Sequence, residues 1–314
     1  MARTILVKSF DGTNLFVRYT KLARAQKLPI ILNDGLGCAG FAWKHIVPAL
    51  KNNHPVIEWN YRGHGKSETP KDLGTMTMEC LARDLMSVLD ALGYDKAISI
   101  GHSMGVQVAL ESHAYFPKRF AGHVFMCGSY KHPIATWHMA HSRSDPNTFF
   151  NFGMRELFPS VTRALIEYDG AFQGLWTRVI SSKFSYHVAR LLEVNHRRVT
   201  SEDFYPYFAS LGAMQAKVFA HLARSYAAHS GEAVLREIKV PTLTIGGGKD
   251  TFCPSWVIED FHKLIRHNEL LMIPDGTHTT PIEHPDLINL RVEKFIRERV
   301  LHSARNRAKK LPRK

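Results

Sequence analysis

The sequence predicts an α/β fold, in which a mostly parallel central sheet has helices on both faces and carries an inserted helical cap. Three observations predict it. Short apolar runs alternate with amphipathic helical segments through the first 130 residues, strand patterns vanish from about 131 to 236, and the alternation then resumes. Alternating strands and helices form parallel sheets covered by helices. We therefore expect a core made of residues 1–130 and 237–301 and a cap, or lid, made of residues 131–236.

The first elements are expected to form a hairpin. Residues 4–7 and 15–19 are apolar runs on either side of Asp11 and Gly12, a pair that favours a tight turn between strands. Buried strands are expected at 29–32, 55–59, 96–100, 122–126, 241–245 and 270–273. Helices of the core are expected at 80–92 and 106–116, and from residues 254 and 285 onward.

The segment 101–105 reads Gly-His-Ser-Met-Gly and joins a predicted strand to a predicted helix. A chain that reverses within so few residues crowds its own backbone, and the two glycines allow the close approach. Ser103 is then left on a strained bend that exposes its hydroxyl and points the helix N-terminus at it. This geometry favours a nucleophile over a serine that only serves a turn.

Two further residues complete a candidate catalytic triad. Asp250 and His278 each follow a predicted strand, as Ser103 does. Because the carboxyl ends of parallel strands share one edge of the sheet, we expect the three side chains to converge. A neutral imidazole takes the serine proton, and a buried carboxylate fixes its tautomer. His284 and His102 are weaker candidates for the base, because His284 precedes a proline at a helix start and His102 adjoins the serine.

Four segments, in this order on these elements, resemble the α/β-hydrolase family with a helical cap. Besides 101–105 they are 60–67 (Asn-Tyr-Arg-Gly-His-Gly-Lys-Ser), 247–254, and 276–278 with its continuation at 283–285. The similarity covers about residues 10 to 300. It implies a serine hydrolase, and the order serine, aspartate, histidine is the one described for this fold. An aspartate nucleophile, as in the haloalkane dehalogenases and epoxide hydrolases of this fold, is excluded by Ser103.

The resemblance also implies an oxyanion hole. One backbone N–H belongs to the residue after the nucleophile, Met104, and by position the second belongs to Leu36 in the loop 33–38. This loop departs from the family pattern, because Asp34 stands where a histidine is usual. A carboxylate near a developing negative charge opposes catalysis unless it points away, so we expect Asp34 to buttress the loop.

Aromatic residues gather in the expected cap. Residues 131–235 hold about half of the chain's aromatic residues in about a third of its length. A small helical subdomain needs its own core, but so aromatic a lid over a serine site also predicts an apolar pocket. The cluster at 204–208 supplies the candidate substrate-binding residues, which are Phe204, Tyr205, Tyr207 and Phe208.

These residues predict an esterase-like or lipase-like serine hydrolase that cleaves carboxylic esters with a lipophilic part by way of an acyl-enzyme. A small-molecule ester is the expected partner, and neither a cofactor nor a metal is expected. The same triad serves lactonases, carbon–carbon bond hydrolases, perhydrolases and acyltransferases, and the sequence leaves these alternatives open. A ligand-binding protein that keeps the fold without activity is the alternative from another class.

Two other motifs are set aside. Residues 245–251 hint at a phosphate loop, but Leu243 stands where its first glycine must be. His138 and His141 share one face of a predicted helix without a clear third ligand, so we expect no metal site there.

The net charge of +13 is partly local. Residues 302–314 hold six lysines and arginines and no acid, and such a tail is usually solvated and disordered. Weak contact with an anionic membrane surface is its functional alternative. Binding to nucleic acid is not expected, because no recognised motif accompanies the charge.

The overall composition is that of an ordinary soluble protein, with 45% hydrophobic and 22% charged residues. No apolar run approaches a membrane span, and residues 1–8 are too soon interrupted by charge for a secretory signal. Four scattered cysteines indicate no disulfide framework. We therefore expect a cytoplasmic protein, whose oligomeric state the sequence does not fix.

Overall fold

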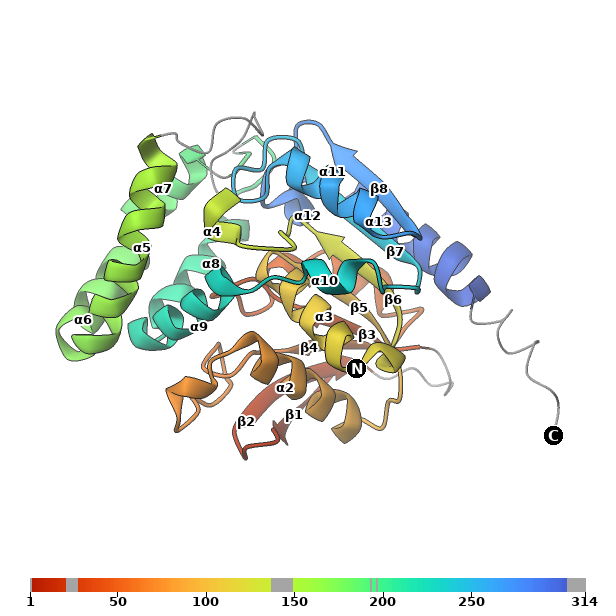
Figure 1. Cartoon of the computed structure of the whole chain (residues 1–314), viewed down its shortest axis with the longest axis horizontal. Helices are drawn as coiled ribbons and strands as arrows, with labels where there is room; N and C mark the ends of the chain where they lie inside the picture. Colours follow the sequence, from red (N-terminus) through yellow and green to blue (C-terminus); the bar gives the residue numbers. More distant parts are fainter. Residues whose placement is uncertain (1, 21–27, 137–148, 193, 196, 304–314) are drawn as a thin grey trace.

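An eight-stranded sheet forms the middle of the protein (Figure 1). The computed structural model describes residues 2–20, 28–136, 149–192, 194–195 and 197–303. The strand order is β1-β2-β4-β3-β5-β6-β7-β8. The strands are β1 (Ala2–Lys8), β2 (Asn14–Thr20), β3 (Ile30–Asn33), β4 (Val56–Trp59), β5 (Ala97–His102), β6 (Phe120–Met126), β7 (Thr242–Gly247) and β8 (Asn268–Ile273).

The sheet is mostly parallel, which confirms the predicted fold class. β1 and β2 form an antiparallel hairpin with Ala2 opposite Thr20, and β2 runs antiparallel to β4. Every other neighbouring pair of strands is parallel. The carboxyl ends of β3 to β8 therefore meet at one edge, and ligands bind at that edge in open sheets of this kind.

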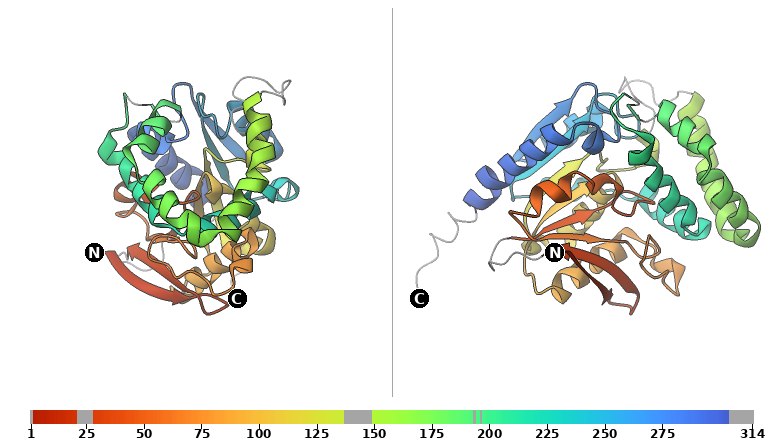
Figure 2. Two further views of the ribbon diagram at one scale, coloured as in Figure 1. Left: turned by 90° about the vertical axis from the view of Figure 1, so that its left-hand side faces the viewer. Right: turned by 180° about the vertical axis from the view of Figure 1, so that it is seen from behind.

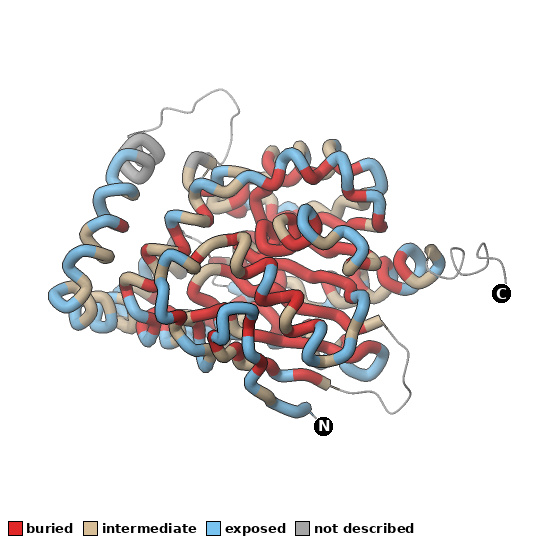
Figure 3. Tube along the Cα trace, turned by 60° about the horizontal axis from the view of Figure 1, so that its bottom comes forward, coloured by how far each residue is buried: buried red, intermediate tan, exposed pale blue. Residues whose placement is uncertain are grey.

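Helices pack on both faces of the sheet because successive residues of a strand point to opposite faces. In β3, Ile30 and Leu32 belong to the apolar cluster that contains Ile46 of α1, whereas Ile31 belongs to the cluster that contains Leu85 of α2. The strands are buried throughout the middle of the sheet (Figure 3). The helices of the core are α1 (Ile46–Leu50), α2 (Met78–Ala91), α3 (Met104–Tyr115), α11 (Ser255–Leu264), α12 (Thr280–Glu283) and α13 (Pro285–Phe295).

Further helices are inserted between β6 and β7. In the two views of Figure 2 the longer ones stand together at one end of the molecule. The described residues between the two strands form these helices and the loops that join them, with one isolated bridge. The inserted helices are α4 (Pro133–Thr136), α5 (Phe149–Glu167), α6 (Asp169–Ile180), α7 (Lys183–Leu192), α8 (Ser201–Ala213), α9 (Ala216–Ala228) and α10 (Glu232–Leu235).

The two ends of this insertion lie side by side. Lys131 and Ser230 form an isolated antiparallel bridge, and the Gly231 N–H donates to the Tyr130 carbonyl at 2.8 Å. An ion pair joins Lys131 to Glu232. The chain therefore enters and leaves the inserted helices through one narrow connection.

The final helix extends further than the sequence predicts. After α13 the chain continues as a π-helical turn (Ile296–Val300), and residues 301–303 are still helical. The prediction of a disordered tail is therefore wrong for His302 and Ser303. The rest of that tail, residues 304–314, lies outside the described residues. His138 and His141 also lie outside them. In the described part of the chain, no helix combines the length and the apolar character needed to cross a bilayer.

Candidate active site

Ser103 lies on a sharp bend between β5 and α3, with φ 55° and ψ −123°. The two flanking glycines are required by close backbone contacts. A Cβ at Gly105 would lie 1.9 Å from the Asn33 carbonyl oxygen, and one at Gly101 would lie 2.5 Å from the Gly105 carbonyl oxygen. α3 begins at Met104, directly after the serine and earlier than predicted, so the helix N-terminus adjoins the Ser103 hydroxyl.

The structure brings Ser103, His278 and Asp250 together. His278 Nε2 lies 2.9 Å from Ser103 Oγ, and its Nδ1 lies 3.0 Å from Asp250 Oδ2. The buried Asp250 carboxylate also accepts the backbone N–H groups of Phe252 at 2.9 Å and Cys253 at 2.8 Å. Because an ionised carboxylate can only accept a hydrogen bond, Nδ1 carries the ring proton and Nε2 is left free to accept the serine proton.

The Asp250 carboxylate, the Cys253 thiol and His278 also form a group with ligand atoms within 4.8 Å of one another. Such a trio has the donor types of a zinc site. However, both ring nitrogens of His278 are already engaged, Nδ1 by Asp250 and Nε2 by Ser103. A metal at this position would have to break the hydrogen-bond chain, so the residues do not fit one.

His102, the neighbour of the serine, supports the histidine instead of replacing it. Its Nε2 lies 2.9 Å from the backbone carbonyl of His278, and a carbonyl can only accept, so Nε2 carries the proton. Burial lowers the pKa of His102 to about 3, so the ring is neutral. His102 thus holds the His278 backbone in place through a hydrogen bond to its carbonyl.

Glu283 holds the loop that carries the histidine. Its buried carboxylate accepts the Thr277 N–H at 2.7 Å, the Thr277 hydroxyl at 2.5 Å and the Thr279 hydroxyl at 2.9 Å. It also accepts the backbone N–H of Asn195, in the inserted segment, at 2.9 Å. The inserted segment therefore docks on the histidine loop through the same carboxylate that shapes this loop.

The loop that carries Leu36 packs against the nucleophile. A Cβ at Gly35 would lie 3.3 Å from Ser103 Cβ. In the described part of the chain, neither the Leu36 N–H nor the Met104 N–H donates a hydrogen bond to another protein group. Both amides therefore remain available to a substrate oxygen, as an oxyanion hole requires.

Asp34 braces this loop from within. Its carboxylate accepts the Gly40 N–H at 2.8 Å, while its backbone carbonyl accepts the Tyr61 hydroxyl at 2.8 Å. Burial, together with the charge of Glu58, raises the pKa of Asp34 to about 7 despite the Gly40 hydrogen bond. The side chain thus carries less than a full negative charge at neutral pH, so it opposes an oxyanion less than a fully ionised carboxylate at the same position would.

His64 is a second brace. Its Nε2 accepts the Gly37 N–H at 3.2 Å, and its Nδ1 donates to the Arg62 carbonyl at 3.1 Å. Burial lowers the pKa of His64 to about 4, which keeps Nε2 unprotonated and able to accept. The segment that resembles the family at 60–67 therefore supports the oxyanion loop.

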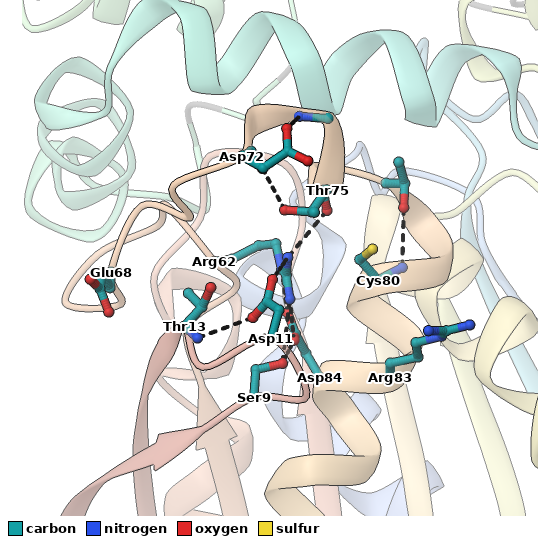
Figure 4. A network of polar contacts seen from close by, with 12 residues as sticks. Ser9, Asp11, Thr13, Arg62, Glu68, Asp72, Thr75, Cys80, Arg83 and Asp84 are labelled. Carbon is teal, nitrogen blue, oxygen red and sulfur yellow. Dashed lines mark hydrogen bonds and ion pairs between the residues drawn. The ribbon is translucent and has the colours of Figure 1, made fainter.

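That segment is anchored by a buried ion network (Figure 4). The fully buried Arg62 guanidinium donates to both oxygens of Asp84, at 2.8 and 2.7 Å, and to Asp11 at 2.8 Å. Ser9 donates its hydroxyl to the same Asp84 carboxylate. Two-pronged pairs of this kind fix geometry as well as charge. They tie the β1–β2 turn and α2 to the loop beneath the site.

A cavity of about 450 Å³ opens above Ser103 and His278. All the inserted helices from α5 to α9 contribute to its wall, and no lysine, arginine, aspartate or glutamate is among the described residues that line it. Nine of the lining residues carry an aromatic ring other than histidine: Phe41, Phe158, Trp176, Phe204, Tyr207, Phe208, Phe219, Tyr226 and Phe252.

Three of the four candidate substrate-binding residues, Phe204, Tyr207 and Phe208, line this cavity. Tyr205 does not, and that prediction is wrong. Its side chain is 45% exposed and its hydroxyl donates to the Ser181 carbonyl at 3.4 Å. With 3.6 residues per turn, positions 204, 207 and 208 of α8 lie within about 100° of one another around the helix, whereas position 205 lies about 160° from position 207. Residues 204, 207 and 208 therefore face the cavity and Tyr205 faces outward.

Tyr226 is a cavity residue that the sequence analysis missed. It lies on α9, far along the chain from the serine, yet it lines the same cavity as Ser103. Burial raises the pKa of Tyr226, so the phenol stays protonated and able to donate. No motif marked it in the sequence, because one tyrosine among the cap aromatics carries no signal of its own.

Curated proteins that are similar to this chain align with it over nearly its full length. A family model described as alpha/beta hydrolase fold matches residues 29–285. 3-Oxoadipate enol-lactonase 1 of Acinetobacter baylyi is 27% identical over 90% of this chain and 93% of its own length. Epoxide hydrolase 4 of Mus musculus is 22% identical over 91% of this chain and 80% of its own length.

Solved structures share the fold. A thermophilic esterase from Thermogutta terrifontis has a TM-score of 0.73 at 20% identity, covering 94% of this chain and 98% of its own. The enol-lactonase from Burkholderia xenovorans has a TM-score of 0.74 at 19% identity, covering 94% of this chain and 100% of its own. Since the family model spans most of the sequence, from β3 to the start of α13, the chain belongs to the alpha/beta hydrolase family and is a hydrolase of that superfamily.

Proposed function

We propose that this protein hydrolyses neutral, lipophilic carboxylic esters. The observation that carries the proposal is the pairing of Ser103 and His278 on the wall of a cavity whose described lining has no lysine, arginine or carboxylate. A substrate that brings its own carboxylate into such a cavity loses water without gaining a cation, which costs several kcal/mol. A neutral ester avoids that cost, and the aromatic wall favours an apolar acyl or alcohol group.

In the proposed reaction, Ser103 Oγ attacks the ester carbonyl while His278 Nε2 takes the hydroxyl proton. Asp250 stabilises the imidazolium, and the N–H groups of Leu36 and Met104 stabilise the oxyanion. The bond to the alkoxy oxygen then breaks, and His278 gives the proton to the leaving alcohol. Water attacks the acyl-enzyme in the same way, which releases the acid and restores Ser103.

The test compares two substrates with equal acyl length, p-nitrophenyl butyrate and the p-nitrophenyl monoester of succinic acid. We expect kcat/KM to be about 10² or more higher for the neutral ester, because the second substrate must bury an unpaired carboxylate. The Ser103→Ala protein is the blank for both. Equal rates for the two substrates, or a preference for the charged one, would contradict the proposal.

A second candidate is the hydrolysis of neutral lactones, since the similarity to 3-oxoadipate enol-lactonase 1 extends over 90% of this chain. Phenyl acetate and dihydrocoumarin form a matched pair, because both are phenol esters and only the second is cyclic. We expect the open ester to be the better substrate. A preference of about tenfold or more for dihydrocoumarin, which corresponds to 1.4 kcal/mol, would favour the lactonase.

A further inference from the structure

A second hollow lies at the opposite edge of the sheet from Ser103, where β7 and β8 begin. Its volume is about 500 Å³. Lys239 comes from the loop before β7, Arg266 and His267 come from the loop before β8, and Arg299 and Ser303 come from the final helix. Figure 1 shows that this helix lies at the far end of the molecule from α5 and α6. Three separate parts of the chain thus bring basic side chains around one hollow.

The fold does not neutralise these charges. Lys239 and Arg266 are exposed, and neither forms an ion pair with any residue that the structure describes. The one acid of the lining, Glu269, already pairs with Arg291 and Arg299. Partial burial raises the pKa of Glu269, but the hydrogen bonds from the two arginines outweigh it and keep the carboxylate ionised. The lining of the hollow therefore has three lysine and arginine side chains and one carboxylate, and that carboxylate also pairs with Arg291 outside the hollow.

Like charges held this close repel one another, and a bound anion removes the repulsion. The planar guanidinium of Arg266 matches two oxygens of a phosphate, the Lys239 ammonium supplies a point charge, and the Ser303 hydroxyl offers a further donor. The electrostatic field around the hollow therefore attracts anions.

We propose that this hollow is a binding site for phosphate groups, separate from the catalytic cavity. The chemistry fits the phosphate of a soluble phosphorylated molecule and that of a phospholipid headgroup alike. A soluble ligand would leave the protein free in solution. A headgroup would hold this edge of the sheet against the membrane, so that the catalytic cavity faces away from it.

The test uses the full chain and inorganic pyrophosphate as the probe, with binding measured by calorimetry at low ionic strength. The variant Lys239→Glu/Arg266→Glu reverses the two unpaired charges. Lys71→Glu/Lys183→Glu is the matched control, since it makes the same change of charge at two exposed lysines outside the hollow. We expect at least about tenfold weaker binding for the hollow variant and less than about twofold for the control.

Vesicles of phosphatidylglycerol or phosphatidylcholine distinguish the two sources of phosphate. If the protein sediments with the anionic vesicles and pyrophosphate releases it, the site binds a lipid headgroup. If the protein binds pyrophosphate but does not sediment with the vesicles, the site binds a soluble ligand. Turnover of a short soluble ester and the thermal melt report that both variants are folded, and neither should change. The proposal is overturned if the wild type shows no saturable pyrophosphate binding, or if both variants lose affinity equally.

Discussion

The Glu283 carboxylate accepts the backbone N–H of Thr277 at 2.7 Å, one residue before the histidine that faces Ser103. The same carboxylate receives the Asn195 N–H at 2.9 Å. The position of His278 therefore depends on how the inserted segment is docked, although neither Glu283 nor Asn195 lines the catalytic cavity among the described residues. We regard Glu283 as a positioning residue, and its role can be separated from a merely structural one by kinetics.

Glu283→Gln should lower kcat by about 10²-fold with little change in KM. The NH₂ group of the glutamine would face N–H and O–H donors that now bind the Glu283 carboxylate, and the repulsion would shift His278. The measurement is steady-state kinetics on a short neutral ester. The control is Glu259→Gln, at an exposed glutamate on α11, which should leave both constants unchanged. A raised KM with normal kcat would instead assign Glu283 to binding.

Asp250→Asn should reduce kcat by about 10⁴-fold, because an amide that donates to Nδ1 selects the wrong tautomer of His278. Ser103→Ala should cost more, about 10⁵ to 10⁶-fold, since the nucleophile itself is removed. Single-substrate kinetics with both proteins checks the order. If Asp250→Asn kept nearly normal turnover, another group would have to orient the histidine.

Asp34→Asn should stabilise the protein increasingly as the pH rises. The folded pKa of Asp34, about 7, lies above the unfolded value of 3.8, so below pH 3.8 both states are protonated and the wild type has no penalty. Between these values only the unfolded state loses its proton, and stability falls until pH 7 by on the order of 4 kcal/mol. Urea unfolding at pH 4 and pH 8 measures it, and an equal effect of the substitution at both pH values would contradict the shift.

The buried pair His113 and His123, whose ring nitrogens lie 2.9 Å apart, should make the protein sensitive to acid. Burial, and for His123 also the charge of His113, lowers both pKa values, that of His113 to about 4. Below the unfolded value of about 6.5 only the unfolded state takes up these protons, so stability is lost as the pH falls.

His123→Leu removes one of these groups. From pH 6.5 downward the free energy of unfolding of the wild type should fall more steeply than that of the variant, by about 1.4 kcal/mol per pH unit. Parallel curves would show that His123 is protonated in the folded protein. His187→Gln, at an exposed histidine, serves as the control.

Phe208→Ala should flatten the dependence of kcat/KM on acyl chain length. In the wild type each added CH₂ should contribute up to about 0.8 kcal/mol, or roughly threefold, until the pocket is filled. Tyr205→Ala is the matched control on the same helix, because Tyr205 is exposed and does not line the cavity. A flat profile in the wild type would remove the lipophilic part of the proposed specificity, and an equal effect of the two substitutions would mean that α8 acts through folding alone.

The fold and the convergence of three side chains could be predicted because both follow from local patterns. Ser103, Asp250 and His278 each follow the carboxyl end of a strand (β5, β7 and β8), and parallel strands bring these ends to one edge of the sheet. Helical phase decides finer questions. The sequence shows the aromatic cluster at 204–208, but which of its rings face inward depends on how α8 packs, so the sequence alone does not exclude Tyr205 from the cavity.

Except for Asp34, the supporting residues could not be predicted, because their partners lie far away in the sequence. Glu283 and Asn195 are separated by 88 positions, and no periodicity links them. Asp34 braces its loop as the sequence predicts, but its partner, the Gly40 N–H, is seen only in the structure. The role of His64, which accepts the Gly37 N–H, could not be predicted at all. Tyr226 shares the cavity with Ser103 only because α9 forms part of the cavity wall.

The bridge between Lys131 and Ser230 has a consequence for how proteins of this architecture diversify. Because the insertion begins and ends at adjacent points, another segment whose ends are equally close can replace it without changing the sheet register, provided that it also supplies the donor that Asn195 gives to Glu283. The entropic cost of closing an inserted segment between these two points rises only slowly with the length of the segment. The inserted helices can therefore be exchanged as a unit, so that the same core and catalytic residues can act on a new class of substrate.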